Sequence, residues 1–317
     1  MSAENAERKV VLAALAGNLG IAVTKFGAAW WSGSAAMLSE GVHTLVDTTN
    51  ELLLLYGMRR AAEPPSAAHP FGHGRELYFW SFIVALLVLI LGAGVAVWQG
   101  VAQLRDPEPM RSPWVNYVVL ASSLLFEGAS WRVAFRRFRK SKGGQTWLEA
   151  FRSSKDASTF TVLLEDTAAV AGLTIAFVGV ASAQFFEAPR LDGFASIGIG
   201  MVLATASLLL LGETKALLIG EAARPEVRDS ILRIAESDEG IRSANGVLTS
   251  HLGPRHVVAA LSAEFEDHLD TRRIEACIDR VEAAIKNAHP EVRLLFVKPQ
   301  TPEAWRARVR GDVVRGG

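Results

Sequence analysis

Two side chains that can ligate a metal ion lie four residues apart in an apolar stretch of the chain. They are His43 and Asp47, within SEGVHTLVDTTNELLLLYG. Residues i and i+4 share a face of a helix, and Ser39 and Glu51 continue this face one turn to either side. A neutral imidazole and a carboxylate suit zinc and similar divalent ions. Two ligands do not complete a tetrahedral site, so a second helix must contribute.

A second polar pair, Glu165 and Asp166, interrupts the apolar stretch VLLEDTAAVAGL. Adjacent residues lie about 100° apart on a helix, so we expect one carboxylate to bind the ion and the other to support it or to handle protons. The sequence leaves open which does which. Burying a charged Asp in hydrocarbon costs at least about 2.5 kcal/mol, so these groups should face a bundle interior with a partner or an ion. Hydrogen-bonded helix association is the alternative.

Further polar residues fall in or near apolar segments. Glu51 and Glu127 are candidate proton-relay groups, because each interrupts such a segment. Lys25 lies near the end of its segment and is predicted to extend its ammonium group to the membrane surface. His69 and His73 flank a Phe-Gly turn and are a candidate loop metal site, although two surface histidines often have no such role.

Long apolar segments position these residues and indicate a membrane protein. Half of the 317 residues are hydrophobic, and mean hydropathy is positive. The zero net charge gives no argument for a nucleic-acid partner, and the single Cys277 excludes an internal disulfide or a cysteine metal cluster. The first apolar run lacks a signal-peptide cleavage pattern and is expected to stay as an anchor. Windows of about twenty apolar residues predict an all-α six-helix transmembrane bundle, with spans near 9–31, 34–57, 77–101, 113–134, 157–182 and 193–219.

The distribution of basic residues predicts the orientation of this bundle. Lys and Arg concentrate between the second and third spans and between the fourth and fifth, whereas the other links carry few. The positive-inside rule therefore puts both termini in the cytoplasm, and we expect a multi-pass protein of the cell (inner) membrane. An aromatic belt is expected at the outer side, formed by Trp30, Trp31, Trp98 and Trp114.

A soluble pattern begins at about Glu221. Apolar spacing and turn residues predict the order α-β-β-α-β over about 80 residues, which suggests a small α+β domain. We therefore expect a transport domain over 1–220, a cytoplasmic domain over 221–300 and a flexible tail over 301–317.

Several motifs together resemble the cation diffusion facilitator family of divalent-metal/proton exchangers. The resemblance covers nearly the whole chain and is carried by SGSAAMLSEGVHTLVDTTNELLLLYG, HPFGHGRELYFW, the six-span layout and SHLGPRHVVAALSAEF. It implies a ferredoxin-like cytoplasmic domain and a homodimer whose cytoplasmic domains contribute to the contact.

The resemblance also assigns residues by position. His43 and Asp47 match the family's transport-site ligands from span two, and Asp166 matches the final Asp of span five. The position four before it is Val162, so one usual ligand is missing and Glu165 is the candidate replacement. This Glu-Asp variant resembles the zinc-transporter branch.

Outside the bundle the match to the family's metal sites is partial. His69 and His73 match a loop-borne zinc site of some members, but Ser66 replaces its acidic partner. The strand LLFVKPQ lacks the His and Asp that bridge a zinc pair in some relatives, so no strong binuclear site is predicted there.

The expected function is efflux of a divalent cation in exchange for protons by alternating access, with zinc as the first choice of transported ion and no organic cofactor. An exchanger for manganese, iron, cobalt or cadmium is one alternative, and a non-transporting membrane metal sensor is another. The chain has no His-Glu-x-x-His or G-x-S-x-G motif, so an enzyme is not expected.

Overall fold

The computed structural model describes residues 18–107, 113–141, 157–254 and 256–315. These residues divide into two compact units. One contains the described residues up to Arg60 together with Glu76–Lys215, and the other contains Ala61–Arg75 together with the residues from Ala216 onward. The loop with His69 and His73 therefore belongs to the second unit, whereas the sequence suggests that it is part of a transport domain over 1–220.

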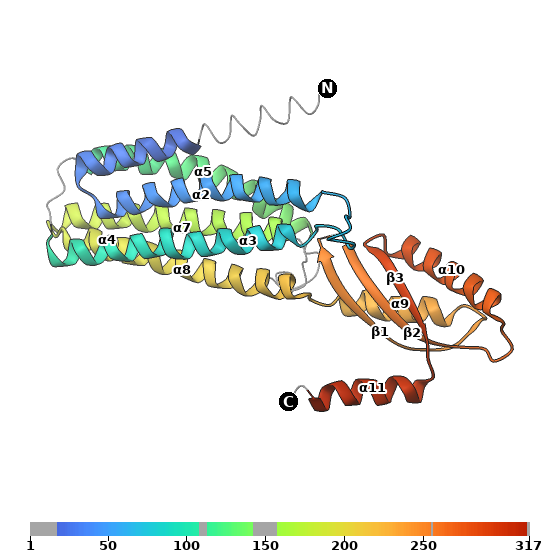
Figure 1. Cartoon of the computed structure of the whole chain (residues 1–317). Coiled ribbons are helices and arrows are strands. Elements are labelled where there is room, and N and C mark those ends of the chain that lie inside the picture. Colours follow the sequence, from blue (N-terminus) through green and yellow to red (C-terminus); the bar gives the residue numbers. More distant parts are fainter. Residues whose placement is uncertain (1–17, 108–112, 142–156, 255, 316–317) are drawn as a thin grey trace, which may run out of the picture. The chain divides into compact units, whose positions relative to one another are not determined.

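The first unit consists of long helices that run alongside one another (Figure 1). Four of the described helical segments are long and apolar enough to cross a membrane: Glu76–Arg105, Trp114–Arg136, Leu163–Phe185 and Arg190–Ile219. The chain is therefore an integral membrane protein. The helices are residues 18–32, α2 (Ala35–Ala61), α3 (Glu76–Leu87), the π-helical η1 (Val88–Ala93), α4 (Gly94–Arg105), α5 (Pro113–Ser141), α7 (Ala157–Phe185) and α8 (Arg190–Ile219).

The four segments coincide with the third to sixth predicted spans. The first predicted span starts in residues outside the described part of the chain. The second corresponds to α2, whose apolar stretch carries Glu40, Asp47 and Glu51. The charged residues that lower the hydropathy of α2 thus include Asp47, a candidate metal ligand, and Glu51, a candidate proton-relay group.

The start of α2 is fixed by a side chain from another helix. Asp192, in the first turn of α8, accepts hydrogen bonds from the backbone N–H of Ala35 at 2.6 Å and from Ser34 Oγ at 2.8 Å. The first N–H groups of a helix have no intrahelical partner, and a carboxylate is a favourable acceptor for them. Asp192 is buried, and its partners lie more than 150 residues away along the chain.

Helices α4 and α8 touch through glycines. A Cβ at Gly100 would lie 2.6 Å from the carbonyl oxygen of Gly193, and one at Gly193 would lie 2.9 Å from that of Gly100. Small residues allow such close approach of transmembrane helices.

We expect Gly100→Val to lower the stability of the detergent-solubilised protein by about 1–3 kcal/mol or more, because the added atoms must push the two backbones apart. The matched control is Gly128→Ala in α5, where a Cβ meets no atom within 4 Å. This control should be neutral or slightly stabilising, as helical Gly→Ala changes are in open space. Thermal unfolding measures both, and equal effects of the two changes would contradict the glycine contact.

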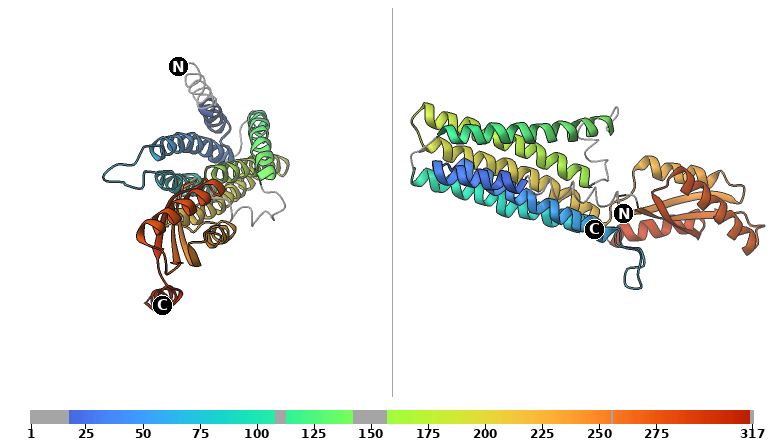
Figure 2. Two further views of the ribbon diagram at one scale, coloured as in Figure 1. Left: turned by 90° about the vertical axis from the view of Figure 1, so that its right-hand side faces the viewer. Right: turned by 90° about the horizontal axis from the view of Figure 1, so that it is seen from above.

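The second unit is a three-stranded sheet packed with helices (Figure 2). The sheet order is β1-β2-β3, with β1 and β2 antiparallel and β2 and β3 parallel. Its core includes Ile231, Leu261, Val281 and Ile285. The elements follow the predicted order: α9 (Pro225–Glu236), β1 (Ile241–Gly253), β2 (His256–Phe265), α10 (Thr271–Ala288) and β3 (Val292–Pro299).

The segment after β3 forms helix α11 (Pro302–Arg315), where the sequence suggests a flexible tail. Proline is well suited to the first turn of a helix. The indole of Trp305 lies so close to β1 that a Cβ at Gly246 would be 2.5 Å from it. Residue 246 therefore leaves room for Trp305, and this packing is a long-range contact that the local polarity of the tail does not indicate.

The single cysteine is held in a polar cluster of the second unit. The Cys277 thiol donates to Asp238 Oδ1 at 3.2 Å, and Arg280 donates to both oxygens of Asp238 at 2.7 and 2.9 Å. Burial and the Asp238 carboxylate raise the pKa of the Cys277 thiol to about 11.

We expect Cys277 to be alkylated by N-ethylmaleimide at pH 8 at least about tenfold more slowly in the folded protein than in urea, because the thiolate is the reactive form. As Cys277 is the only cysteine, the intact mass reports its modification alone. Equal rates in the folded and unfolded states would contradict the buried, protonated thiol.

Candidate metal site in the helical unit

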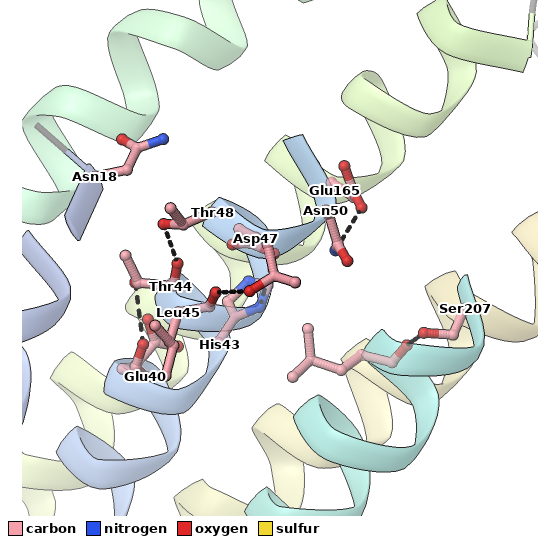
Figure 3. Close-up of polar contacts among 12 residues, drawn as sticks. Asn18, Glu40, His43, Thr44, Leu45, Asp47, Thr48, Asn50, Glu165 and Ser207 are labelled. Carbon is pink, nitrogen blue, oxygen red and sulfur yellow. Dashed lines mark hydrogen bonds and ion pairs between the residues drawn. The ribbon is translucent and has the colours of Figure 1, made fainter. Parts of the chain in front are cut away.

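One face of α2 carries a line of polar side chains. Glu40, His43, Asp47 and Asn50 follow one another at intervals of three or four residues, so they project on the same side of the helix (Figure 3). His43 is buried, and the side chain of Asp47 is 24% exposed. His43 Nδ1 lies 3.4 Å from Asp47 Oδ1. The two residues expected to share a ligand face therefore do lie together.

Three polar atoms of His43 and Asp47 are not used in hydrogen bonds with the described residues. Neither ring nitrogen of His43, nor Asp47 Oδ1, makes a hydrogen bond with any residue that the structure describes. Buried polar atoms normally have partners, and an exception needs an explanation. A neutral imidazole has one nitrogen lone pair, and a carboxylate oxygen is an acceptor, so both can bind a cation.

Glu165 of α7 lies against the same face of α2. Asn50 Nδ2 donates to Glu165 Oε1 at 3.0 Å (Figure 3). Glu165 and His43 also line one cavity of about 10 Å³, a volume close to that of a single water-sized probe. Glu165 is therefore the span-five carboxylate that approaches the His43 pair. The remaining wall of the cavity is apolar apart from one hydroxyl and includes Val88, Leu203 and Ser207.

Asp166 turns toward a different helix. Its Oδ2 accepts a hydrogen bond from Ser130 Oγ of α5 at 3.2 Å. The neighbouring carboxylates of α7 thus contact α2 and α5 separately, which is the geometry that a 100° offset produces. By position in the family motif Asp166 is the expected ligand, yet Glu165 is the carboxylate beside the polar face of α2.

No group of three or more His, Cys, Asp or Glu side chains in the described residues converges closely enough to hold a metal ion. The ligand types are present on facing helices, but Asn50 engages Glu165. Coordination by His43, Asp47 and Glu165 therefore requires a change of side-chain or helix position.

The candidate relay carboxylates have different surroundings. Glu51 accepts a hydrogen bond from Asn18 Nδ2 at 2.9 Å, which links α2 to residues 18–32. Glu127 is partly buried on α5.

Lys25 does not extend to the membrane surface as the sequence suggests. It is 1% exposed, and its Nζ lies 3.2 Å from Glu40 Oε2 and 2.8 Å from Thr44 Oγ1. The sequence prediction was wrong because Glu40 and Thr44 of α2 provide an internal partner for the ammonium, which the position of Lys25 near the end of the span does not indicate. A carboxylate three residues before His43 was the available signal for an internal partner.

The loop histidines lie together in the second unit. The ring centroids of His69 and His73 are 4.5 Å apart, with the rings tilted by 46°. Ser66, which replaces the acidic partner, instead accepts a hydrogen bond from the backbone N–H of His69 at 3.2 Å. This is a turn contact, so the loop offers two nitrogen ligands without the third.

These observations define an integral membrane protein that carries His, Asp and Glu side chains, which are of the types that can bind metal ions, between its helices. The family model for the cation efflux transmembrane domain matches residues 11–219, which is well over half of the chain. The chain belongs to the cation efflux family, also called the cation diffusion facilitators, and its relatives identify the zinc branch.

Three relatives illustrate the similarity. The proton-coupled zinc antiporter SLC30A9, mitochondrial, of Mus musculus is 34% identical over 83% of this chain and 47% of its own length. Metal tolerance protein C4 of Arabidopsis thaliana is 31% identical over 78% of this chain and 54% of its own. The cation-efflux pump FieF of Cronobacter sakazakii is 27% identical over 89% and 90%. The chain thus spans about half the length of the first two, and the mouse and bacterial relatives are named as an antiporter and an efflux pump, which are transporters and not enzymes.

Proposed function

We propose that this protein exports a divalent cation, with zinc as the first choice, in exchange for protons by alternating access. The observation that carries the proposal is the His43–Asp47 pair, in which the buried ring nitrogens of His43 and the buried Oδ1 of Asp47 make no hydrogen bond with a described residue. The names of the mouse and bacterial relatives, a proton-coupled zinc antiporter and a cation-efflux pump, support this choice.

In the proposed mechanism the ion binds His43, Asp47 and Glu165, with water completing the shell. Asn50 supplies the hydrogen bond that holds Glu165 when no ion is bound, and it is given up when the carboxylate turns to the ion. Asp166, supported by Ser130, handles protons at the adjacent position.

Exchange follows from competition for the same atoms. A ligating imidazole must be neutral and a ligating carboxylate must be ionised, so ion binding displaces protons and proton binding displaces the ion. An inside-negative potential opposes cation export and favours proton entry by about 2.3 kcal/mol per charge per 100 mV. Inward proton movement therefore provides the driving force for efflux.

The proposal includes the setting of the site. It comprises a transport domain over 1–220 with six spans. The protein lies in the cell (inner) membrane with both termini in the cytoplasm. It forms a homodimer. The proposal also includes a ferredoxin-like fold for the cytoplasmic domain over 221–300, which the α-β-β-α-β order supports. His69 and His73 are proposed as a secondary loop site of low affinity, since they offer two ligands only.

Purified protein in proteoliposomes under a pH gradient tests the proposal. Addition of zinc should produce a proton flux together with zinc movement. Manganese, iron, cobalt and cadmium should compete with labelled zinc less strongly than unlabelled zinc does. Zinc binding without flux of either species would instead identify a membrane metal sensor. Preference for another of these ions would replace zinc as the transported ion.

A further inference from the structure

A fully buried ion pair lies beside the candidate metal site. The ammonium of Lys25, from the helix of residues 18–32, contacts Glu40 Oε2 at 3.2 Å and Thr44 Oγ1 at 2.8 Å. Lys25 is 1% exposed and Glu40 is 0% exposed. Charged residues within the membrane region are costly and usually mark a functional pathway.

The position of Glu40 makes it a potential ligand. Glu40 precedes His43 by three residues, and residues at this spacing are neighbours on a helix surface. Thr44, the second partner of Lys25, directly follows His43, and Figure 3 labels all three on successive parts of α2. Glu40 is therefore one turn from the His43–Asp47 pair on the polar face.

One oxygen of Glu40 is turned toward the helix that carries Glu165. Glu40 Oε1 has no hydrogen-bond partner among the described residues. A Cβ at Gly172 of α7 would lie 2.7 Å from this oxygen. Gly172 follows Glu165 by seven residues, which is about two turns, so both are on the side of α7 that faces α2. The free oxygen thus lies in the same seam between helices as the proposed ion ligands.

We propose that Lys25 is a tethered counter-cation that sets the affinity of the metal site. By pairing with Oε2 and offsetting the charge of the Glu40 carboxylate, its ammonium keeps this carboxylate from joining the ligands of the ion at His43 and Asp47. Metal affinity depends on the number of charged ligands, and an ion that must be transported has to be bound weakly enough to leave. The inference rests on the proposed transport function.

The alternative is that the pair only joins the first span to α2. A buried ion pair is weak evidence for stabilisation, because well-packed apolar residues often do as well, whereas removing one partner leaves a costly unpaired charge. Both interpretations predict less stable single variants. They differ in metal affinity, because the counter-cation model requires opposite effects at the two positions.

The test measures the zinc Kd of the full-length protein in detergent and zinc flux in proteoliposomes. Lys25→Met should tighten zinc binding by at least about tenfold and slow the flux, since Glu40 then joins the ligands. Glu40→Gln should weaken binding by at least about tenfold, because the unpaired ammonium repels the ion. The double variant, which carries neither charge, should return to within a few-fold of the wild-type Kd.

A matched control is Thr24→Val, next to Lys25, where the hydroxyl donates to the Gly20 carbonyl of its own helix at 2.7 Å. It should leave the Kd unchanged. If Lys25→Met does not fold, Lys25→Gln carries the same prediction, because its amide can still donate hydrogen bonds without the charge.

Lys25 variants that bind zinc as the wild type does, or more weakly, overturn the inference even if their melting temperatures fall. Shifts of the same sign at Lys25 and Glu40 also overturn it. Wild-type protein that neither binds nor moves zinc counts against the proposed function instead, so the two failures are distinguishable.

Discussion

Glu165→Gln is expected to lower zinc-dependent proton flux at least about 100-fold, whereas Asp166→Asn should lower it by no more than about tenfold, because Asp166 is proposed to handle protons and not to bind the ion. Loss of even an outer hydrogen-bond partner of a metal ligand typically costs 10–100-fold, so loss of a ligand should cost more. Glu165 lines the cavity with His43 and contacts Asn50 of α2, while Asp166 contacts Ser130 of α5. Flux in proteoliposomes measures both variants.

The two substitutions are matched, because each replaces one carboxylate of an adjacent pair by its amide. Zinc-induced stabilisation of the solubilised protein provides a second measurement: it should be much smaller in Glu165→Gln and persist in Asp166→Asn. The reverse ranking would make Asp166 the ligand, as its position in the family motif indicates, and would assign Glu165 to support.

Asp47→Ala is expected to abolish zinc-dependent proton flux and yet to leave the zinc-free protein as stable as the wild type or more stable. Asp47 Oδ1 is buried and makes no hydrogen bond with a described residue, so its removal releases a desolvation cost of about 1–3 kcal/mol. Thermal unfolding with and without zinc measures the stability, and flux measures the function.

Thr48→Val is the control for Asp47→Ala. Thr48 lies next to Asp47 on α2, and its hydroxyl donates to the Thr44 carbonyl of the same helix at 2.9 Å. Flux should be retained in this variant. Strong destabilisation of the zinc-free protein by Asp47→Ala would indicate that Asp47 serves to hold the helices together.

Local patterns predict the helices and the shared face of His43 and Asp47, because both depend on the period of one helix. The four apolar spans and the α-β-β-α-β order follow from the same periodicities. The pair on α2 needed no knowledge of the tertiary structure, since residues four apart meet on any helix.

Contacts between distant segments are what the sequence does not reveal. Periodicity cannot say whether Glu165 or Asp166 faces α2, because that depends on how α7 is rotated in the bundle. The Lys25–Glu40 pair, the Asp192 cap on α2 and the packing of Trp305 at Gly246 likewise join residues 15 to 158 positions apart. Lys25, Asp192 and Trp305 are polar or aromatic, and their local sequence indicates a position at the surface, in a loop or in the tail.

Proton release on zinc binding is the most direct test of the central claim, that the site between α2 and α7 exchanges a divalent ion for protons. Calorimetric titration of the purified protein with zinc at one pH, in buffers of different ionisation enthalpy, counts the protons released per ion. The account predicts at least about one proton per zinc in the wild type and a smaller number in Glu165→Gln. Zinc binding that releases no protons, or the same number in both proteins, would contradict it.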